Sequence, residues 1–170
     1  MKKRKIILII ASVLLILAAF SFLTTYSGGD NGQELASYLK KYAGHGDLNG
    51  AAVVNRFEHN NERFTLYKHQ ATYFIVWSTK SLLIPGRYKI EGGSLPGSSK
   101  NQDLGEFQKF DSSGLVYILY GPYRSGQIEL NIQTDSQAVQ SKKYEVSGKD
   151  TFVVYTAANN VDRIEYTLKQ

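Results

Sequence analysis

The apolar run Ile6–Leu23, "IILIIASVLLILAAFSFL", constrains the fold more than any other feature of the chain. Its 18 residues carry no charge, and only Ser12 and Ser21 are polar. As a helix rising about 1.5 Å per residue, the run spans roughly 27 Å, close to the thickness of a bilayer's hydrocarbon core. Tyr26, just beyond it, suits the membrane–water interface. We therefore expect a transmembrane signal-anchor helix over residues 6–26.

The charges flanking this run predict its orientation. Lys2, Lys3, Arg4 and Lys5 precede it, and the next basic residue is Lys40. Basic residues stay preferentially on the cytoplasmic side of a membrane. We therefore expect a single-pass protein of the cell membrane, with residues 1–5 as a cytoplasmic basic tip and the C-terminal domain outside.

A cleaved signal peptide is the alternative interpretation of the same run. Signal peptides have shorter apolar cores and end at an A-x-A-like site. In the triplet Ala18-Ala19-Phe20, the bulky Phe20 stands where such a site needs a small residue, which weakens this site. The small-x-small triplets at 19–21 and 25–27 keep secretion after cleavage open as the second localisation.

Composition excludes several classes of function. The chain carries a net charge of +5, but the basic tip supplies most of it, and residues 6–170 together carry +1. A nearly neutral domain is poorly suited to binding a phosphate backbone by counterion release, so we expect no nucleic-acid partner. The absence of cysteine excludes disulfides, thiolate metal sites and a lipid-modified cysteine. Together with the absence of an Asn-x-Ser/Thr sequon, it favours a bacterial cell-envelope protein.

After the apolar run, the sequence predicts a tether and one extracytoplasmic domain. Residues 27–32, "SGGDNG", are turn formers and predict a flexible tether. The domain is expected over residues 33–170 and begins with a short helix. Leu35, Leu39 and Tyr42 fall on one face of that helix, and Gly44 ends it.

From about Gly50 the pattern changes to the two-residue period of strands. In "GQIELNIQ" and in "RIEYTLK", apolar and polar residues alternate, which is typical of antiparallel strands with one buried face. Residues 73–77, "YFIVW", and 115–120, "LVYILY", are continuously apolar and predict central strands. Further strands are expected near 51–57, 63–69, 87–91, 142–147 and 151–157. This predicts a mainly β fold, an antiparallel β-sandwich or open barrel of about 8–9 strands. Residues 92–107 are expected to form a long loop of undetermined role.

No pattern predicts a catalytic residue, a cofactor or a metal site. His59 lies between Glu58 and Glu62, but the spacing differs from that of a helical H-E-x-x-H zinc site, and Asn60-Asn61 indicates a hairpin turn. "GHGDLNG", around His45, is expected to be the turn that ends the first helix. Asp103, Glu106 and Asp111 form a loose acidic cluster that could serve hydrolysis or calcium binding, with a solvated loop as the simpler interpretation.

The best binding candidate is the segment "YGPYRSG", which lies between two predicted strands. Tyr120, Tyr123 and Arg124 are residue types that interfaces use as anchors. The alternative is a hairpin whose tyrosines cover an edge of the sandwich.

These observations favour a membrane-anchored, non-enzymatic extracytoplasmic β-domain that binds a protein partner or an envelope polymer. Two other functions stay open. A small cell-wall hydrolase would need two carboxylates, or a histidine and a carboxylate, converging in a cleft. An accessory subunit of a membrane complex would make its contact through residues 6–26.

Overall fold

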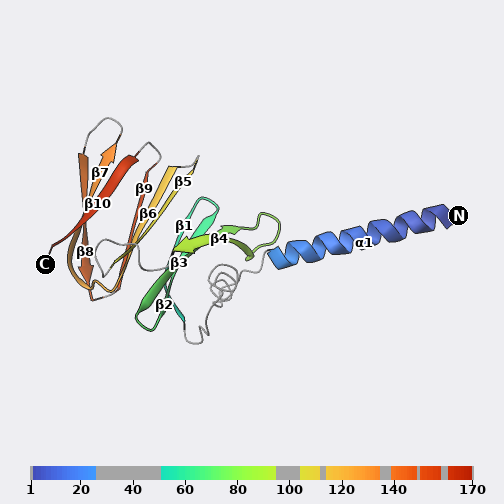
Figure 1. The fold of residues 1–170 in the computed structure, drawn as a ribbon, viewed down its shortest axis with the longest axis horizontal. Coiled ribbons are helices and arrows are strands. Elements are labelled where there is room, and N and C mark those ends of the chain that lie inside the picture. Colours follow the sequence, from blue (N-terminus) through green and yellow to red (C-terminus); the bar gives the residue numbers. More distant parts are fainter. Residues whose placement is uncertain are drawn as a thin grey trace.

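The computed structural model describes residues 2–25, 51–94, 104–111, 114–134, 139–148, 150–157 and 161–169, and in its helix the side chains of residues 6–21 (Figure 1). This part of the chain holds one helix, α1 (Lys2–Thr25), and ten strands. The strands are β1 (Ala52–His59), β2 (Glu62–His69), β3 (Thr72–Lys80), β4 (Tyr88–Ser94), β5 (Gly105–Asp111), β6 (Gly114–Gly121), β7 (Ser125–Thr134), β8 (Val139–Ser147), β9 (Thr151–Ala157) and β10 (Val161–Lys169).

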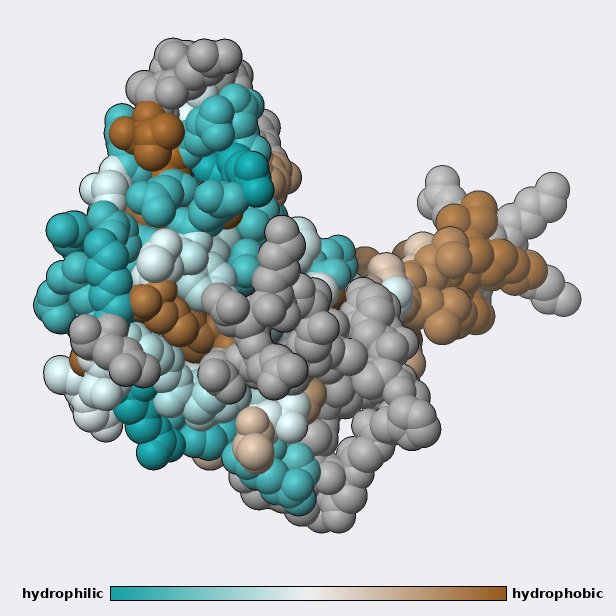
Figure 2. Space-filling model, turned by 60° about the vertical axis from the view of Figure 1, so that its left-hand side comes forward, coloured by the Kyte–Doolittle hydropathy of each residue, from teal (hydrophilic) through white to brown (hydrophobic). Residues whose placement is uncertain are grey.

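Helix α1 extends over the apolar run and lies apart from the strands (Figure 1). Every side chain from Ile6 to Ser21 is exposed. The helix therefore shows an almost wholly apolar surface, brown in Figure 2. In the described residues, no helix combines the length and the apolar character that crossing a bilayer requires. The predicted tether and the predicted helix after it lie outside the described residues.

The strands form three antiparallel sheets. Sheet A is a meander in the order β1-β2-β3-β4, sheet B has the order β5-β6-β9, and sheet C has the order β10-β7-β8. All neighbouring strands run antiparallel. The chain thus completes sheet A before it starts sheet B, and then passes between sheets B and C three times.

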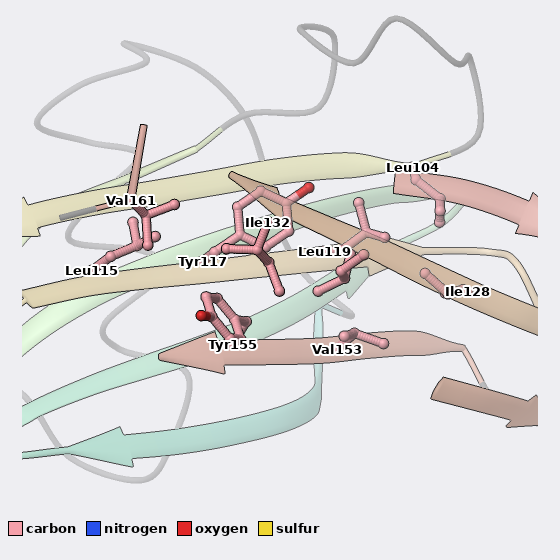
Figure 3. Packing of buried hydrophobic residues seen from close by; sticks show 10 residues of the cluster. Leu104, Leu115, Tyr117, Leu119, Ile128, Ile132, Val153, Tyr155 and Val161 are labelled. Atoms are coloured by element: carbon pink, nitrogen blue, oxygen red, sulfur yellow. The ribbon is translucent and has the colours of Figure 1, made fainter. Parts of the chain in front are cut away.

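One face of sheet B packs against sheet C. From β6, Leu115, Tyr117 and Leu119 share a buried cluster with Ile128 and Leu130 of β7. Figure 3 shows the side chains of β6 and β9 meeting those of β7 in this core. Because side chains alternate along a strand, only the odd-numbered residues of β6 belong to this layer.

The opposite face of sheet B packs against sheet A. Val116, Ile118 and Tyr120 of β6 share a second cluster with Phe64 of β2 and Ile75 of β3. Sheet B therefore lies between the other two sheets, and β6 is its middle strand. This explains why residues 115–120 are apolar without alternation: both faces of β6 are buried.

The mainly β, antiparallel architecture predicted from the sequence is confirmed, and the described residues alone hold ten strands where eight or nine were expected. The strand that the pattern missed is β5. The expected loop 92–107 is also shorter than predicted, because Gly92–Ser94 belong to β4 and Gly105–Phe107 belong to β5. Residues 95–103 lie outside the described part.

The alternation in β5 is hidden by a lysine that faces a core. Lys109 lies on the side of β5 that faces sheet A, where its Nζ donates to Oε2 of Glu62 at 2.7 Å. The two side chains are only 10% and 16% exposed. A largely buried ion pair between residues 47 positions apart gives no local signal, so "GEFQKFD" does not look like a strand with one apolar face.

Candidate functional site

Tyr120, the first of the three predicted binding residues, is a core residue. It lies near the end of β6, faces sheet A and is completely buried. A partner could not reach it without opening the core between sheets A and B. The structure thus separates Tyr120 from the other two candidates.

Tyr123 is half-buried and holds the connection from β6 to β7 in place. Its ring packs against the core between sheets B and C, and its hydroxyl donates to the carbonyl oxygen of Lys169 at 2.9 Å. Gly126 makes this approach possible, since a Cβ there would collide with the Tyr123 hydroxyl and the Lys169 carbonyl. Tyr123 thus covers part of the core, as the alternative interpretation expected, but the connection is not a hairpin, because β6 belongs to sheet B and β7 to sheet C.

Arg124 is the candidate that reaches solvent, and its guanidinium is bonded to a carboxylate. Its Nε donates to Oδ1 of Asp150 at 2.9 Å, while 60% of its side chain is exposed. Its carbonyl oxygen accepts the N–H of Gly148 at 2.7 Å. An exposed arginine that already has a carboxylate partner suits binding, because less side-chain freedom is lost when a second partner docks.

Asp150 links Arg124 to a second cation. Nζ of Lys68, in β2, donates to Oδ2 of Asp150 at 2.8 Å, and the carboxylate is only 12% exposed. Hydrogen bonds, first from Lys68 and then from Arg124 and Tyr73, hold the pKa of Asp150 below its usual range. The same carboxylate raises the pKa of Lys68 and of Arg124. All three groups are therefore ionised at neutral pH, and the cluster carries a net charge of +1.

These residues, called here the Asp150 cluster (Lys68, Tyr73, Arg124 and Asp150), join all three sheets. Lys68 and Tyr73 belong to the β2–β3 hairpin of sheet A, Arg124 lies between β6 and β7, and Asp150 precedes β9. The Oγ1 of Thr151 also donates to the carbonyl oxygen of Tyr123 at 2.5 Å. The loops around Arg124 are thus tied to the scaffold on several sides. Chemically, the cluster can offer an anionic group a pre-positioned guanidinium.

The acidic residues near His59 do not converge on a shared site. Glu58 pairs with Arg63, Oε1 to Nη2 at 2.9 Å, and Arg63 also bonds the hydroxyl of Tyr88. Glu62 pairs with Lys109 between sheets A and B. Neighbouring carboxylates are therefore directed to different basic partners.

The other catalytic candidates are equally dispersed. The ring of His59 stacks on Phe57, with the centroids 6.1 Å apart. Glu106 lies on the opposite face of sheet B, near Tyr117, whose pKa burial raises far above its usual range. Within the described ranges, no group of three or more histidine, aspartate and glutamate residues could hold a metal ion. His45, Asp103 and the side chain of Asp111 lie outside the described part.

Sequence reasoning singled out Arg124 but missed Lys68 and Asp150. They lie 82 positions apart, so no local motif connects them. The usable signal was weaker: "SGKD" places Asp150 after a Ser-Gly turn and directly before a strand.

We found no family model, curated protein or solved structure that matches this chain.

Proposed function

We propose that this chain is a membrane-anchored, non-enzymatic extracytoplasmic β-domain that binds a protein partner or an envelope polymer outside the cell membrane. The membrane and binding parts of the proposal rest on different observations.

The proposed anchor is residues 6–26. The uncharged run Ile6–Leu23 is preceded by four basic residues, and α1 extends over all of it. Its described side chains are exposed around the whole helix, and a helix that is apolar all round requires an apolar environment. Secretion after cleavage stays the alternative localisation.

The proposed binding surface is centred on Arg124. One observation supports it. The side chain of Arg124 is 60% exposed, yet its guanidinium is bonded to the carboxylate of Asp150, which also pairs with Lys68. Arginine held in this way is a frequent source of binding energy in interfaces. With its net charge of +1, the Asp150 cluster suits a partner that presents a carboxylate or a phosphate, such as an acidic protein surface or an anionic envelope polymer.

Replacing Arg124 by alanine is expected to reduce partner capture about tenfold, since truncating an anchoring arginine commonly removes 1.4 kcal/mol or more. The measurement is crosslinking and affinity capture of the C-terminally tagged full chain from membranes, followed by mass spectrometry. Folding stability should fall by less than about 1 kcal/mol, because an exposed ion pair contributes little. Tyr123 is left intact because it supports the loop.

Arg163→Ala is the matched control. Arg163 is 62% exposed and pairs with Glu165 on the outer face of sheet C, away from the Asp150 cluster. The chain with Arg163→Ala should capture the partner as well as the unsubstituted chain does. Equal capture by Arg124→Ala and Arg163→Ala would exclude Arg124 as the anchoring residue.

An accessory subunit of a membrane complex is the second candidate, and the exposed apolar surface of α1 favours it. In that case α1 itself would make the specific contact. Exchanging α1 for an unrelated membrane helix distinguishes the two functions, because a binding domain would keep its partner and an accessory subunit would lose it.

A further inference from the structure

The connection between β3 and β4, residues 81–87, is a tightly closed loop. The Oγ of Ser81 accepts the N–H groups of Leu83 and Ile84 at 3.3 and 3.1 Å. The N–H of Arg87 donates to the carbonyl oxygen of Ile84 at 3.3 Å, and Gly86 has φ +74°. Proline and glycine at the two central positions are typical of a type II turn. The loop therefore holds a defined shape.

This defined shape directs two leucines into solvent. Leu82 is 88% exposed and Leu83 is 79% exposed, more than any other large apolar residue in the described part of the β-domain. Ser81, in contrast, is buried and anchors the base of the loop. An adjacent pair of highly exposed leucines on a hydrogen-bonded turn is unfavourable in water, so the pair points to a contact with an apolar phase.

Basic residues surround the apolar tip. Lys80 and Arg87 flank the loop, and no acidic residue occurs from Arg63 to Ile90. Lys89, the next basic residue, is paired with Glu91 and is not counted with them. Lys80 is exposed and Arg87 is half-buried. An apolar tip flanked by two basic residues matches the boundary between lipid tails and anionic headgroups.

We propose that the β3–β4 loop docks on the outer surface of the bilayer, with Leu82 and Leu83 entering the headgroup region and Lys80 and Arg87 contacting anionic lipid. The inference rests on the proposed anchor, which would keep the domain close to a bilayer. In Figure 1 the loop lies at the end of sheet A toward α1. A protein partner at this loop would need acidic side chains opposite the cations together with an apolar pocket, whereas an anionic bilayer supplies both.

Docking would orient the domain. A single helix and a tether leave a domain free to rotate over the membrane, whereas a second contact restricts it. The Asp150 cluster lies at the opposite end of β3 from this loop. Its member Tyr73 is next to Thr72, where β3 starts, whereas the loop follows Lys80, where β3 ends. A loop docked on lipid would therefore direct the Asp150 cluster away from the bilayer, where a partner could reach it.

The lack of cysteine in the chain allows a direct test with single probes. The full chain carrying Pro85→Cys, or Thr167→Cys on the outer face of sheet C as a control, is labelled with an environment-sensitive fluorophore. Both positions are exposed. Each chain is reconstituted into vesicles of phosphatidylcholine with or without phosphatidylglycerol. Quenching by aqueous iodide and by doxyl groups on the lipid tails is measured, and flotation of the vesicles reports anchoring.

We expect the probe at position 85 to be quenched by lipid and protected from iodide, most strongly with phosphatidylglycerol, while the probe at position 167 stays in water. Adding Leu82→Gln and Leu83→Gln should bring the probe at position 85 into water, because each exposed leucine contributes about tenfold to lipid partitioning. The chain should still float, since α1 is unchanged.

Two results overturn the proposal, and they differ in what else they contradict. If the chain floats and the probe at position 85 is as accessible to iodide as the one at 167, the loop does not dock although the anchor stands. If the chain does not float and both probes stay in water, the anchor and the docking loop both fail.

Discussion

Ile118→Ala and Leu119→Ala, made separately, are each expected to lower the free energy of unfolding by about 3 kcal/mol. The two residues are consecutive on β6 and point to opposite faces of sheet B, yet both are 0% exposed. Ile118 packs toward sheet A and Leu119 packs toward sheet C. Each substitution leaves a cavity in a different core, and chemical denaturation measures both losses.

Two large losses at neighbouring positions test the three-layer arrangement specifically. In a two-layer sandwich, one of two consecutive strand residues faces solvent, and its truncation changes stability by less than about 0.5 kcal/mol. Val139→Ala, at a residue 65% exposed on the edge strand β8, is the control and should fall in that low range. If either Ile118→Ala or Leu119→Ala also falls there, sheet B is not the middle layer.

Lys109→Ala is expected to destabilise the domain by about 3 kcal/mol, because it leaves the carboxylate of Glu62 without its cation between two sheets. The Nζ of Lys109 also lies 4.9 Å from the centroid of the Trp77 ring, so a cation–π contact is lost with the ion pair. Thermal or urea unfolding near neutral pH measures the change.

A double substitution distinguishes the cost of leaving a carboxylate without its cation from the cost of lost packing. Glu62→Gln combined with Lys109→Met removes both charges and keeps the volume, and it should recover most of the stability that Lys109→Ala loses. Lys143→Ala, at an exposed position on β8, should have almost no effect. A loss below about 1 kcal/mol for Lys109→Ala would contradict the largely buried position of this pair between sheets A and B.

The fold could be predicted where the pattern of a strand is local. Alternation in 127–133 and 163–169 identified β7 and β10, whose inner residues Ile128, Leu130 and Ile132 are fully buried. The continuous apolar run 115–120 identified β6, and its position between two sheets explains the run. Strand β5 was missed because its inward Lys109 is neutralised by Glu62, a residue far away in the sequence.

The candidate site could be predicted only in part. Arg124 was correctly placed in a connection between strands, but Tyr120 was assigned to the same connection although β6 extends through Gly121. The partners of Arg124 depend on how three sheets meet, which no single segment encodes. The exposed leucines at 82 and 83 do have a local signal, because "LLIPG" is an apolar run that ends in a turn.

The anchor is the central claim of this account, and the mature N-terminus tests it most directly. The measurement is the intact mass of the tagged chain, recovered separately from the membrane fraction and from the surrounding medium of the cells that produce it. The account predicts a membrane-bound chain that begins at Met1 or Lys2 and retains residues 6–26. A chain that begins after Ser21 or Ser27, recovered outside the membrane, would contradict it and identify a released domain.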